Sequence, residues 1–193
     1  DREAWDRSAN ILREAARKAG IHAIEKEGEA AFYGPKFDFN IKSAIGREFG
    51  ASTNQLDFGS GKRFGLTYND KDGKEKTIPY ILHRAPLGSD ERFIGFLIEH
   101  YAGAFPLWLS PVQVAVLPVG EAHEEYAQGI LKNLKDSGVR AEIKSGGETL
   151  GKRIRAAKLE KIPYFLVVGD NELKAKQVMV ESRDGGQLGA KNI

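Results

Sequence analysis

A short segment that begins at Gly88 combines residue types that bind phosphate. Gly88, Ser89 and Arg92 stand at the predicted start of a helix that continues to Tyr101. A glycine lets the backbone approach a phosphate closely, the first amides of a helix favour anions, and a guanidinium forms two hydrogen bonds to phosphate oxygens. The same residues fit an ordinary helix start with Ser89 as the N-cap. The segment therefore predicts either a phosphate ligand at Arg92 or a capped helix alone.

Four other polar side chains are candidates for a substrate site and a metal site. Tyr33 and Lys36 flank a Gly-Pro turn, and Gln55 leads a strand-like run. The alternative for these residues is a β-turn with a half-buried tyrosine and a strand residue that faces solvent. His83 ends another strand pattern and offers imidazole nitrogens to a metal. A single histidine does not define a zinc site, which needs three or four ligands.

Positive charge gathers on a predicted helix at residues 149–161. Lys152, Arg153 and Arg155 lie in this segment, beside apolar positions that form the other face of the helix. Such a basic side can neutralise the phosphates of an RNA loop. The alternative is a solvated helix face with no ligand, since most runs of charge are of that kind.

The elements that position these side chains follow from the spacing of apolar residues. Residues 3–19 place apolar side chains on one face at helical spacing, which predicts an amphipathic helix. From residue 21 to residue 84 the pattern alternates, and it predicts an antiparallel sheet of about five or six strands. Within it, Asp70-Lys-Asp-Gly-Lys74 indicates a tight hairpin turn.

Beyond a linker with two prolines at residues 103–111 the pattern changes. Apolar strands now alternate with helices of 10 or more residues, which favours βαβ units and a mostly parallel sheet with both faces covered. We therefore expect two domains, residues 1–106 and 107–193. The expected elements of the second are strands at 112–119, 139–143, 164–168 and 178–182 and helices at 122–137 and 149–161.

Composition limits the class of protein. The 193 residues include 29 basic and 27 acidic ones, so RNA binding must come from a local patch rather than from net charge. The absence of cysteine excludes disulfides, thiolate metal clusters and thiol nucleophiles within these residues, and it favours the cytosol. No apolar run approaches the roughly 20 residues that a membrane helix needs. A first residue Asp1 rather than methionine leads us to expect a piece of a longer protein.

Together, these motifs resemble the class II aminoacyl-tRNA synthetases, and among them the threonyl-specific family. The resemblance covers nearly the whole chain. It implies an α+β core fragment with an antiparallel sheet at residues 1–106, followed by an α/β anticodon-binding domain with a mixed, mostly parallel sheet at residues 107–193. The motifs are Ala31-Phe-Tyr-Gly-Pro-Lys36, Gln55-Leu-Asp-Phe58, Gly88-Ser-Asp-Glu-Arg92 and Trp108-Leu-Ser-Pro-Val-Gln-Val114.

The resemblance also implies a role for each candidate residue. Arg92 becomes the catalytic ligand of the ATP γ-phosphate. His83 becomes one of three protein ligands of a single zinc ion, and the other two are expected outside this chain. Contacts to ATP or to the amino acid are implied for Tyr33, Lys36, Gln55 and Ser89, and contacts to tRNA for Lys152, Arg153, Arg155 and Glu172.

The activity implied by the resemblance is threonine–tRNA ligation. The intact enzyme would use ATP with magnesium to activate threonine and would transfer it to threonine tRNA, in the cytoplasm, as a homodimer and without a membrane. This chain alone is expected to be inactive, because the remaining catalytic motifs and zinc ligands are not in it. The alternative is a non-catalytic tRNA- or RNA-binding paralogue or regulator.

The family pattern is incomplete at three places. Phe49 and Gly50 stand where many members carry a Trp-Gln pair whose glutamine contacts ATP. In the second domain, Gly147 lies in a loop that usually reads Arg-Asn-Glu-Lys, and Glu181 replaces a common arginine. These changes leave open the ATP contacts near Gly50 and the choice of anticodon bases.

Overall fold

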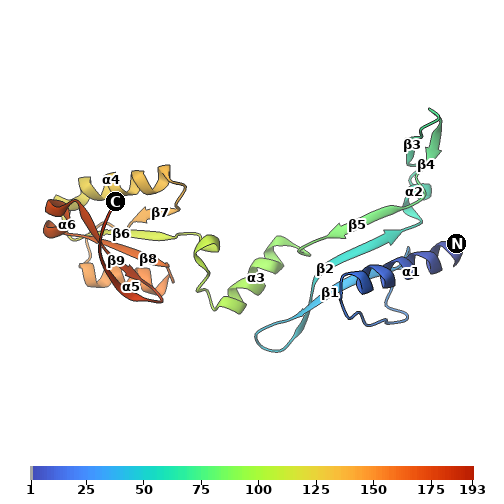
Figure 1. The fold of residues 1–193 in the computed structure, drawn as a ribbon, viewed down its shortest axis with the longest axis horizontal. Coiled ribbons are helices and arrows are strands. Elements are labelled where there is room, and N and C mark those ends of the chain that lie inside the picture. Colours follow the sequence, from blue (N-terminus) through green and yellow to red (C-terminus); the bar gives the residue numbers. More distant parts are fainter. Residues whose placement is uncertain (1) are drawn as a thin grey trace. The chain divides into compact units, whose positions relative to one another are not determined.

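The computed structural model describes residues 2–193, which form two compact units that divide between Phe96 and Leu97 (Figure 1). The part before the division is called unit 1 here, and the part after it unit 2. The division falls inside helix α3, Asp90–Tyr101. The domain boundary that the linker predicts, at residue 106, stays a prediction.

Unit 1 is built on a three-stranded antiparallel sheet in the order β1-β2-β5 (Figure 1). The central strand β2 pairs with β1 on one side and with β5 on the other. A separate two-stranded hairpin, β3-β4, follows the sheet's central strand in sequence. The elements are α1 Arg2–Lys18, β1 Lys36–Lys42, β2 Glu48–Asp57, α2 Ser60–Arg63, β3 Thr67–Asn69, β4 Glu75–Thr77 and β5 Ile81–Ala85.

The expected helix and the expected antiparallel pairing are confirmed, but the expectation of one sheet with about five or six strands is wrong. Residues 21–32 form no strand; an isolated bridge joins Ala31 to Gly34. The β3-β4 hairpin has the predicted turn, with Gly73 at φ +73°, yet it pairs with itself alone. An alternating apolar pattern shows that a segment can form a β-strand. It does not show which other strand the segment pairs with, so it cannot predict the size of a sheet.

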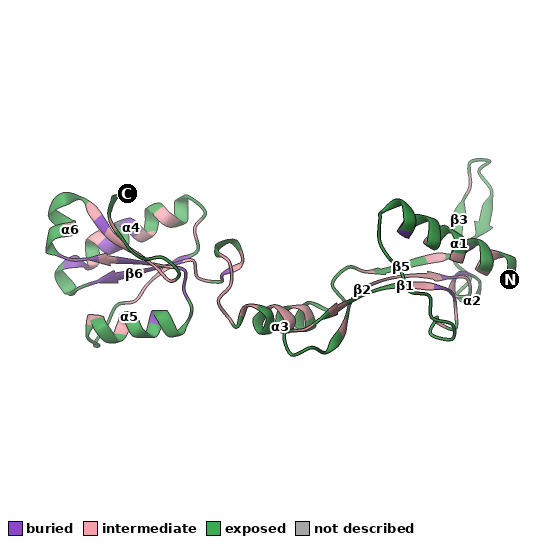
Figure 2. Ribbon diagram, turned by 60° about the horizontal axis from the view of Figure 1, so that its bottom comes forward, coloured by how far each residue is buried: buried purple, intermediate pink, exposed green. Residues whose placement is uncertain are grey.

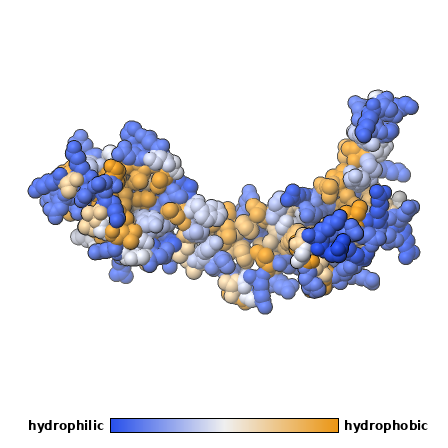
Figure 3. All heavy atoms as spheres, viewed as in Figure 1, coloured by the Kyte–Doolittle hydropathy of each residue, from blue (hydrophilic) through white to orange (hydrophobic). Residues whose placement is uncertain are grey.

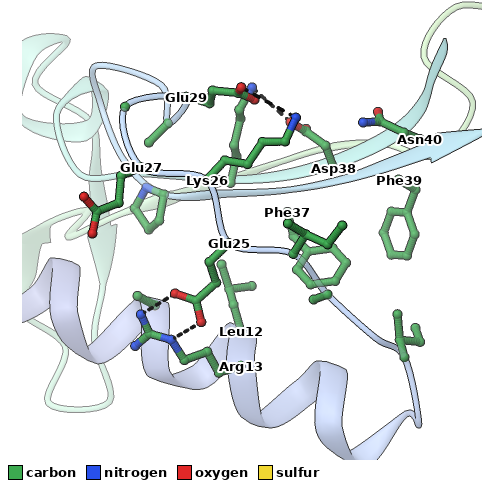
Figure 4. Close-up of a pocket in the computed structure, with 18 of the residues that line it drawn as sticks. Leu12, Arg13, Glu25, Lys26, Glu27, Glu29, Phe37, Asp38, Phe39 and Asn40 are labelled. Atoms are coloured by element: carbon green, nitrogen blue, oxygen red, sulfur yellow. Dashed lines mark hydrogen bonds and ion pairs between the residues drawn. The ribbon is translucent and has the colours of Figure 1, made fainter. Parts of the chain in front are cut away.

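Helix α1 packs over one face of β1. Figure 4 shows Phe37 and Phe39 on the side of β1 that faces Leu12 of α1, while Asp38 points to the other side. The two phenyl rings contact each other at a centroid distance of 5.0 Å. A cleft of about 700 Å³ remains between α1, residues 21–30 and β1. We call the side of the sheet that carries Phe37 and Phe39 and faces α1 the helix face.

One irregularity interrupts the pairing of β1 with β2. Phe39 lies opposite Ser52 and Asn40 lies opposite Gly50, so Ala51 is an extra residue in β2. Such a β-bulge shifts the alternation of the bulged strand by one position. Beyond it, Phe49 pairs with Ile41 and therefore points to the helix face, where its ring stacks on Phe96 of α3 at 5.7 Å.

Unit 2 is a mixed five-stranded sheet in the order β10-β9-β8-β6-β7. Strand β6 pairs in parallel with β7 and β8, whereas β9 pairs antiparallel with β8 and β10. The short 3₁₀ turns η1 Leu107–Leu109 and η2 Glu121–His123 accompany β6 Val114–Pro118, α4 Glu124–Asp136, β7 Ala141–Ile143, α5 Leu150–Leu159, β8 Tyr164–Val168, α6 Asp170–Ala175, β9 Gln177–Ser182 and β10 Gly186–Asn192.

The α/β expectation for this unit, with a mixed sheet and helices on both faces, is confirmed. All five residues of β6 are buried. Val116 packs in a cluster with residues of α4, and Leu117 packs in a second cluster with Ala157 of α5. Helix α6 and strand β10 were not predicted, because α6 has only six residues and β10 is polar and contains two glycines.

The apolar core of the described residues lies almost entirely in unit 2. Among residues 2–193, the buried apolar side chains of unit 1 are Ala16, Pro35 and Ala51, and the purple segments of Figure 2 concentrate on β6 and its neighbours. Unit 1 instead leaves large side chains outside, including Ile24 and Leu82 at 77% and 68% exposure. Figure 3 shows apolar (orange) atoms on the surface of this unit. No helix among residues 2–193 is long and apolar enough to cross a membrane.

Two leucine substitutions in unit 2 test where the core lies. Leu117 is fully buried in β6, and Leu159 at the end of α5 is 72% exposed. We expect Leu117→Ala to lower the free energy of unfolding by about 2–5 kcal/mol, because it leaves a cavity. Leu159→Ala is the matched control and should stay within about 0.5 kcal/mol. Urea unfolding in a Trp5→Phe background, with Trp108 as the fluorescent reporter, measures both; equal losses would contradict this placement of the core.

Candidate functional site

Three of the predicted site residues lie in one row across the sheet of unit 1. The pairing register places Lys36 of β1 opposite Gln55 of β2, and Gln55 opposite His83 of β5. Residues directly opposite each other in antiparallel strands share a face and lie about 5 Å apart. The side chains of this row therefore lie together on the side of the sheet away from the helix face, which we call the polar face.

Tyr33 joins this row because the chain before β1 runs against β2. The Tyr33 carbonyl accepts a hydrogen bond from the Phe58 amide at 3.0 Å, and the Pro35 carbonyl accepts one from Leu56 at 3.0 Å. A Cβ atom on Gly34 would lie 1.7 Å from the Leu56 carbonyl oxygen, so only glycine permits this approach. The Tyr33 hydroxyl then donates a hydrogen bond to the side-chain oxygen of Gln55.

The row continues into a network of polar side chains. The Gln55 amide donates to the Thr53 hydroxyl at 3.3 Å, and that hydroxyl donates to Asp38 at 2.6 Å. The second Asp38 oxygen pairs with Lys36 Nζ at 2.9 Å. Each partner restrains the next, so the network holds Gln55 and Lys36 in place before any ligand binds.

Asp57 connects the end of β2 to His83. One carboxylate oxygen, Oδ2, lies 3.0 Å from His83 Nε2 and accepts a hydrogen bond from the Ser60 hydroxyl at 2.5 Å. The other, Oδ1, accepts hydrogen bonds from the backbone amides of Gly59 and Ser60 at 2.8 and 2.9 Å. The Ser60 hydroxyl, the Ser60 and Gly59 amides and His83 together hold the pKa of Asp57 well below its ordinary value, against burial, which raises it.

Asp57 is the site residue that the sequence did not single out. It lies within the Gln55–Phe58 motif but received no role. Thr53, Gln55 and Asp57 alternate along β2, and alternate residues of a strand share a face. That spacing, applied to the strand that carries Gln55, is the signal that could have identified it.

Arg92 and Ser89 lie apart from the row. The Arg92 guanidinium carbon lies 5.9 Å from the centroid of the Phe49 ring. Phe49 and Gln55 are six residues apart on β2, which corresponds to roughly 20 Å along a strand. Ser89 caps α3, since its hydroxyl accepts a hydrogen bond from the Arg92 amide at 3.3 Å, and Gly88 before it has φ +70°. Their contacts to substrate stay predictions.

In unit 2 the three predicted basic residues have different surroundings. Arg153 donates hydrogen bonds to the carbonyls of Pro118 and Lys144 at 2.7 and 2.9 Å, and further bonds to the backbone at residues 119 and 148. Arg155 is exposed, and no hydrogen bond or ion pair joins it to any of residues 2–193. Lys152 is exposed and lies 3.6 Å from Glu148. Arg153 therefore binds its own backbone, whereas Arg155 and Lys152 are accessible to a ligand.

The acidic residues of unit 2 also have intramolecular partners. Glu172 accepts a hydrogen bond from the Gly169 amide at 3.0 Å and so caps the short helix α6. Glu181 on β9 pairs with Lys158 of α5 at 2.5 Å. Nearby, His123 is buried and lies 3.0 Å from Asp170, while its other nitrogen accepts a hydrogen bond from Gly120. The role of Glu172 toward RNA stays a prediction.

Residues 2–193 contain no group of three or more side chains placed to hold a metal ion. His83 fits the part of a single ligand, because one ring nitrogen faces Asp57 and the side chain is 47% exposed. The cleft beside α1 reaches the edge of β1, and Lys36 is the sole predicted site residue among the described residues that line it.

Two family models match the chain, and they cover different parts of it. One, described as the tRNA synthetase class II core domain (G, H, P, S and T), matches residues 2–101. The other, described as the anticodon binding domain, matches residues 113–192. The first match includes every predicted residue of the polar face and of the α3 start, and the second includes α5 and α6.

Curated relatives resemble the chain along nearly all its length. A threonine–tRNA ligase from Natranaerobius thermophilus is 47% identical over 191 residues, which are 99% of this chain and 30% of the relative. One from Thermus thermophilus is 50% identical over 189 residues, which are 98% of this chain and 28% of the relative. The chain thus spans less than a third of the length of these two relatives.

Solved structures share the fold. The RNA binding domain of threonyl-tRNA synthetase from Cryptosporidium parvum superposes with a TM-score of 0.83 at 38% identity, over 96% of this chain and 46% of that one. A putative threonyl-tRNA synthetase from Aeropyrum pernix gives 0.73 at 32% identity, over 100% of this chain and 45% of that one.

The contrast between Arg153 and Arg155 can be measured directly. We expect Arg153→Lys to lower the free energy of unfolding of unit 2 by about 1.5–3 kcal/mol, because a lysine cannot satisfy the several carbonyls that the guanidinium reaches. Arg155→Lys makes the same chemical change at an exposed position and should cost no more than about 0.5 kcal/mol. Urea unfolding in the Trp5→Phe background, followed by Trp108 fluorescence, compares them, and a stable Arg153→Lys variant would show that these bonds are dispensable.

Proposed function

Because the chain belongs to the class II aminoacyl-tRNA synthetases, we propose that it is part of a threonine–tRNA ligase. In this proposal unit 1 contributes to the site that activates threonine with ATP, and unit 2 binds threonine tRNA. The observation that carries the proposal is the polar face, where Tyr33, Lys36, Gln55 and His83 meet. A module that only binds RNA would have little physical reason to keep these four side chains together.

The polar face suits a substrate that bears a hydroxyl group. An apolar pocket separates threonine from valine only weakly, whereas fixed polar partners reject the analogue that lacks the hydroxyl. The Tyr33–Gln55 hydrogen bond and the Thr53–Asp38–Lys36 network supply such fixed partners. We assign the amino-acid end of the substrate to this row and Lys36 to the adenylate.

A zinc ion fits the proposal as a group shared with residues outside this chain. His83 would hold it, and the bound ion would coordinate the amino and hydroxyl groups of threonine. A zinc ion that acts on a substrate would take three protein ligands and keep room for the substrate. The contribution of this chain is an imidazole held at the edge of the row by Asp57.

Arg92 is proposed to bind the γ-phosphate of ATP, which is accompanied by magnesium. Its position at the start of α3, above Phe49, puts it at the far end of β2 from His83. In this proposal the amino acid therefore binds at the His83 end of β2, and the γ-phosphate of ATP binds at the Phe49 end. The charge of the guanidinium would offset the negative charge on the triphosphate during attack on the α-phosphate.

Unit 2 is proposed to contact the anticodon loop through the exposed cations of α5. Lys152 and Arg155 are accessible, whereas Lys158 is paired with Glu181. Glu181 and Gly147 differ from the residues that the family usually carries, so we expect fewer direct base contacts at these positions. Homodimer formation, a cytoplasmic location and a domain boundary at residue 106 complete the proposal.

Binding to tRNA tests the part of the proposal that concerns unit 2. We expect the 193-residue chain to prefer a threonine-tRNA transcript over one with an exchanged anticodon, and to retain that preference as salt is raised. Base contacts survive salt, whereas phosphate contacts weaken steeply with it. Filter binding at two salt concentrations measures both. If both transcripts bind equally and the binding disappears at high salt, unit 2 attracts RNA through its charge alone and does not recognise the anticodon bases.

A charge-removal pair tests α5 itself. Arg155→Ala should weaken binding to both transcripts. It should also reduce the slope of log K against log salt concentration by about one, the value expected for one lost phosphate contact. Arg7→Ala removes the same charge from an exposed position on α1 and is expected to leave the salt dependence unchanged. Identical salt slopes for the two variants would remove Arg155 from the interface.

A test of the role of Arg92 requires a ligase with a full-length catalytic domain. In such a protein, Arg92→Ala should slow the formation of threonyl-adenylate by about 100-fold or more, because one preorganised charge on the transition state is lost. ATP–pyrophosphate exchange measures this step. Arg17→Ala on α1 serves as the control, and a similar small effect of both substitutions would argue against a phosphate role for Arg92.

A further inference from the structure

The two ring nitrogens of His83 have unequal surroundings. Nε2 lies 3.0 Å from Asp57 Oδ2. Nδ1 has no hydrogen-bond partner among residues 2–193, and the ring is tilted against Tyr33 at a centroid distance of 5.6 Å. The side chain is 47% exposed, so the free nitrogen is reachable from the polar face. One nitrogen is therefore held by the protein and the other is available.

Asp57 is held in place by partners other than His83. Its side chain is 2% exposed, and it accepts hydrogen bonds from the Gly59 amide and from both the amide and the hydroxyl of Ser60. A charged carboxylate accepts hydrogen bonds and donates none. In the neutral ring the nitrogen that faces Asp57 must then carry the proton. The lone pair is left on Nδ1.

No other side chain of the row competes for this function. The Gln55 amide is engaged by Tyr33 and Thr53 on its two ends. Asp38, the other carboxylate on the polar face, is held by Lys36 and Thr53. Asp57 is thus the group that decides which nitrogen of His83 faces the substrate side.

We propose that Asp57 is a positioning residue that holds the His83 proton on Nε2 and presents Nδ1 as the metal-binding atom. The metal part rests on the proposed function, whereas the proton position rests on the contacts of Asp57 alone. A carboxylate or carbonyl behind a histidine ligand fixes the ring and strengthens its basicity, and its loss typically costs 10- to 100-fold in metal affinity. Asp57 therefore acts on the substrate site through His83.

The proton position can be read by long-range ¹H–¹⁵N correlation spectra of the chain without added metal. A neutral imidazole carries one proton on one of its two nitrogens, so the spectra of the neutral ring show one protonated and one bare nitrogen. His83→Gln identifies the His83 signals by their disappearance. We expect the wild-type signals to show the proton on Nε2, and a proton on Nδ1 or an even mixture of both forms would overturn the proposal.

Two substitutions separate positioning from a general structural effect. Asp57→Asn should populate the Nδ1-protonated form, because the amide oxygen stays with the Gly59 and Ser60 amides and the NH2 group, a donor, then faces Nε2. Asp38→Asn changes a carboxylate on the same face that does not contact His83, and it should keep the wild-type pattern. An unchanged pattern in a folded Asp57→Asn variant would refute the positioning role. Should that variant unfold, the wild-type spectrum still decides, and Ser60→Ala, which keeps the carboxylate, should retain the Nε2 proton.

Zinc affinity then distinguishes this inference from the proposed function. In a ligase that supplies the other ligands, Asp57→Asn should weaken zinc binding by about 10- to 100-fold in competition with a chelator. A ligase that binds zinc without any dependence on Asp57 would overturn the second half of the inference. If the ligase binds no zinc at His83 while the proton sits on Nε2, the metal role proposed for His83 fails and the positioning by Asp57 stands.

Discussion

The register of β2 is the constraint on which unit 1 depends. This strand has a partner on each side, so one alignment sets both Lys36 against Gln55 and Gln55 against His83. A slip of one residue would carry every side chain of the strand to the opposite face. Hydrogen bonds at the strand's end, from Gly59 and Ser60 to Asp57, help to hold that alignment where the chain leaves the sheet.

The two units reach a defined structure by different means. Unit 2 buries apolar strands between helices, and it ties its loops with arginines that bind backbone carbonyls; Arg140, Arg153 and Arg183 each do so. Unit 1 buries few apolar side chains and orders its exposed face through a chain of polar contacts. A polar network is specific only when each member is satisfied, and here each member of the row has a partner.

Residue types and spacing predicted the class of both units and most elements of unit 2, because an apolar strand beside an amphipathic helix has few ways to pack. They also selected Tyr33, Gln55 and His83, but not the register that brings these residues together. Arg153 and Arg155 look alike in sequence, and only the positions of the carbonyls at Pro118 and Lys144 separate them. The false strands before residue 33 arose because alternation is local while sheet pairing is not.

The extra residue at Ala51 makes the length of β2 as important as its composition. Because the bulge lies between Gln55 and Phe49, the two halves of the strand display opposite alternation, one toward the polar face and one toward α3. Deleting a single residue there would leave Gln55 in register but turn Phe49 to the polar face. Phe49 would then lose its stacking contact with Phe96 of α3. Homologous chains should therefore vary in sequence along this strand more readily than they gain or lose residues in it.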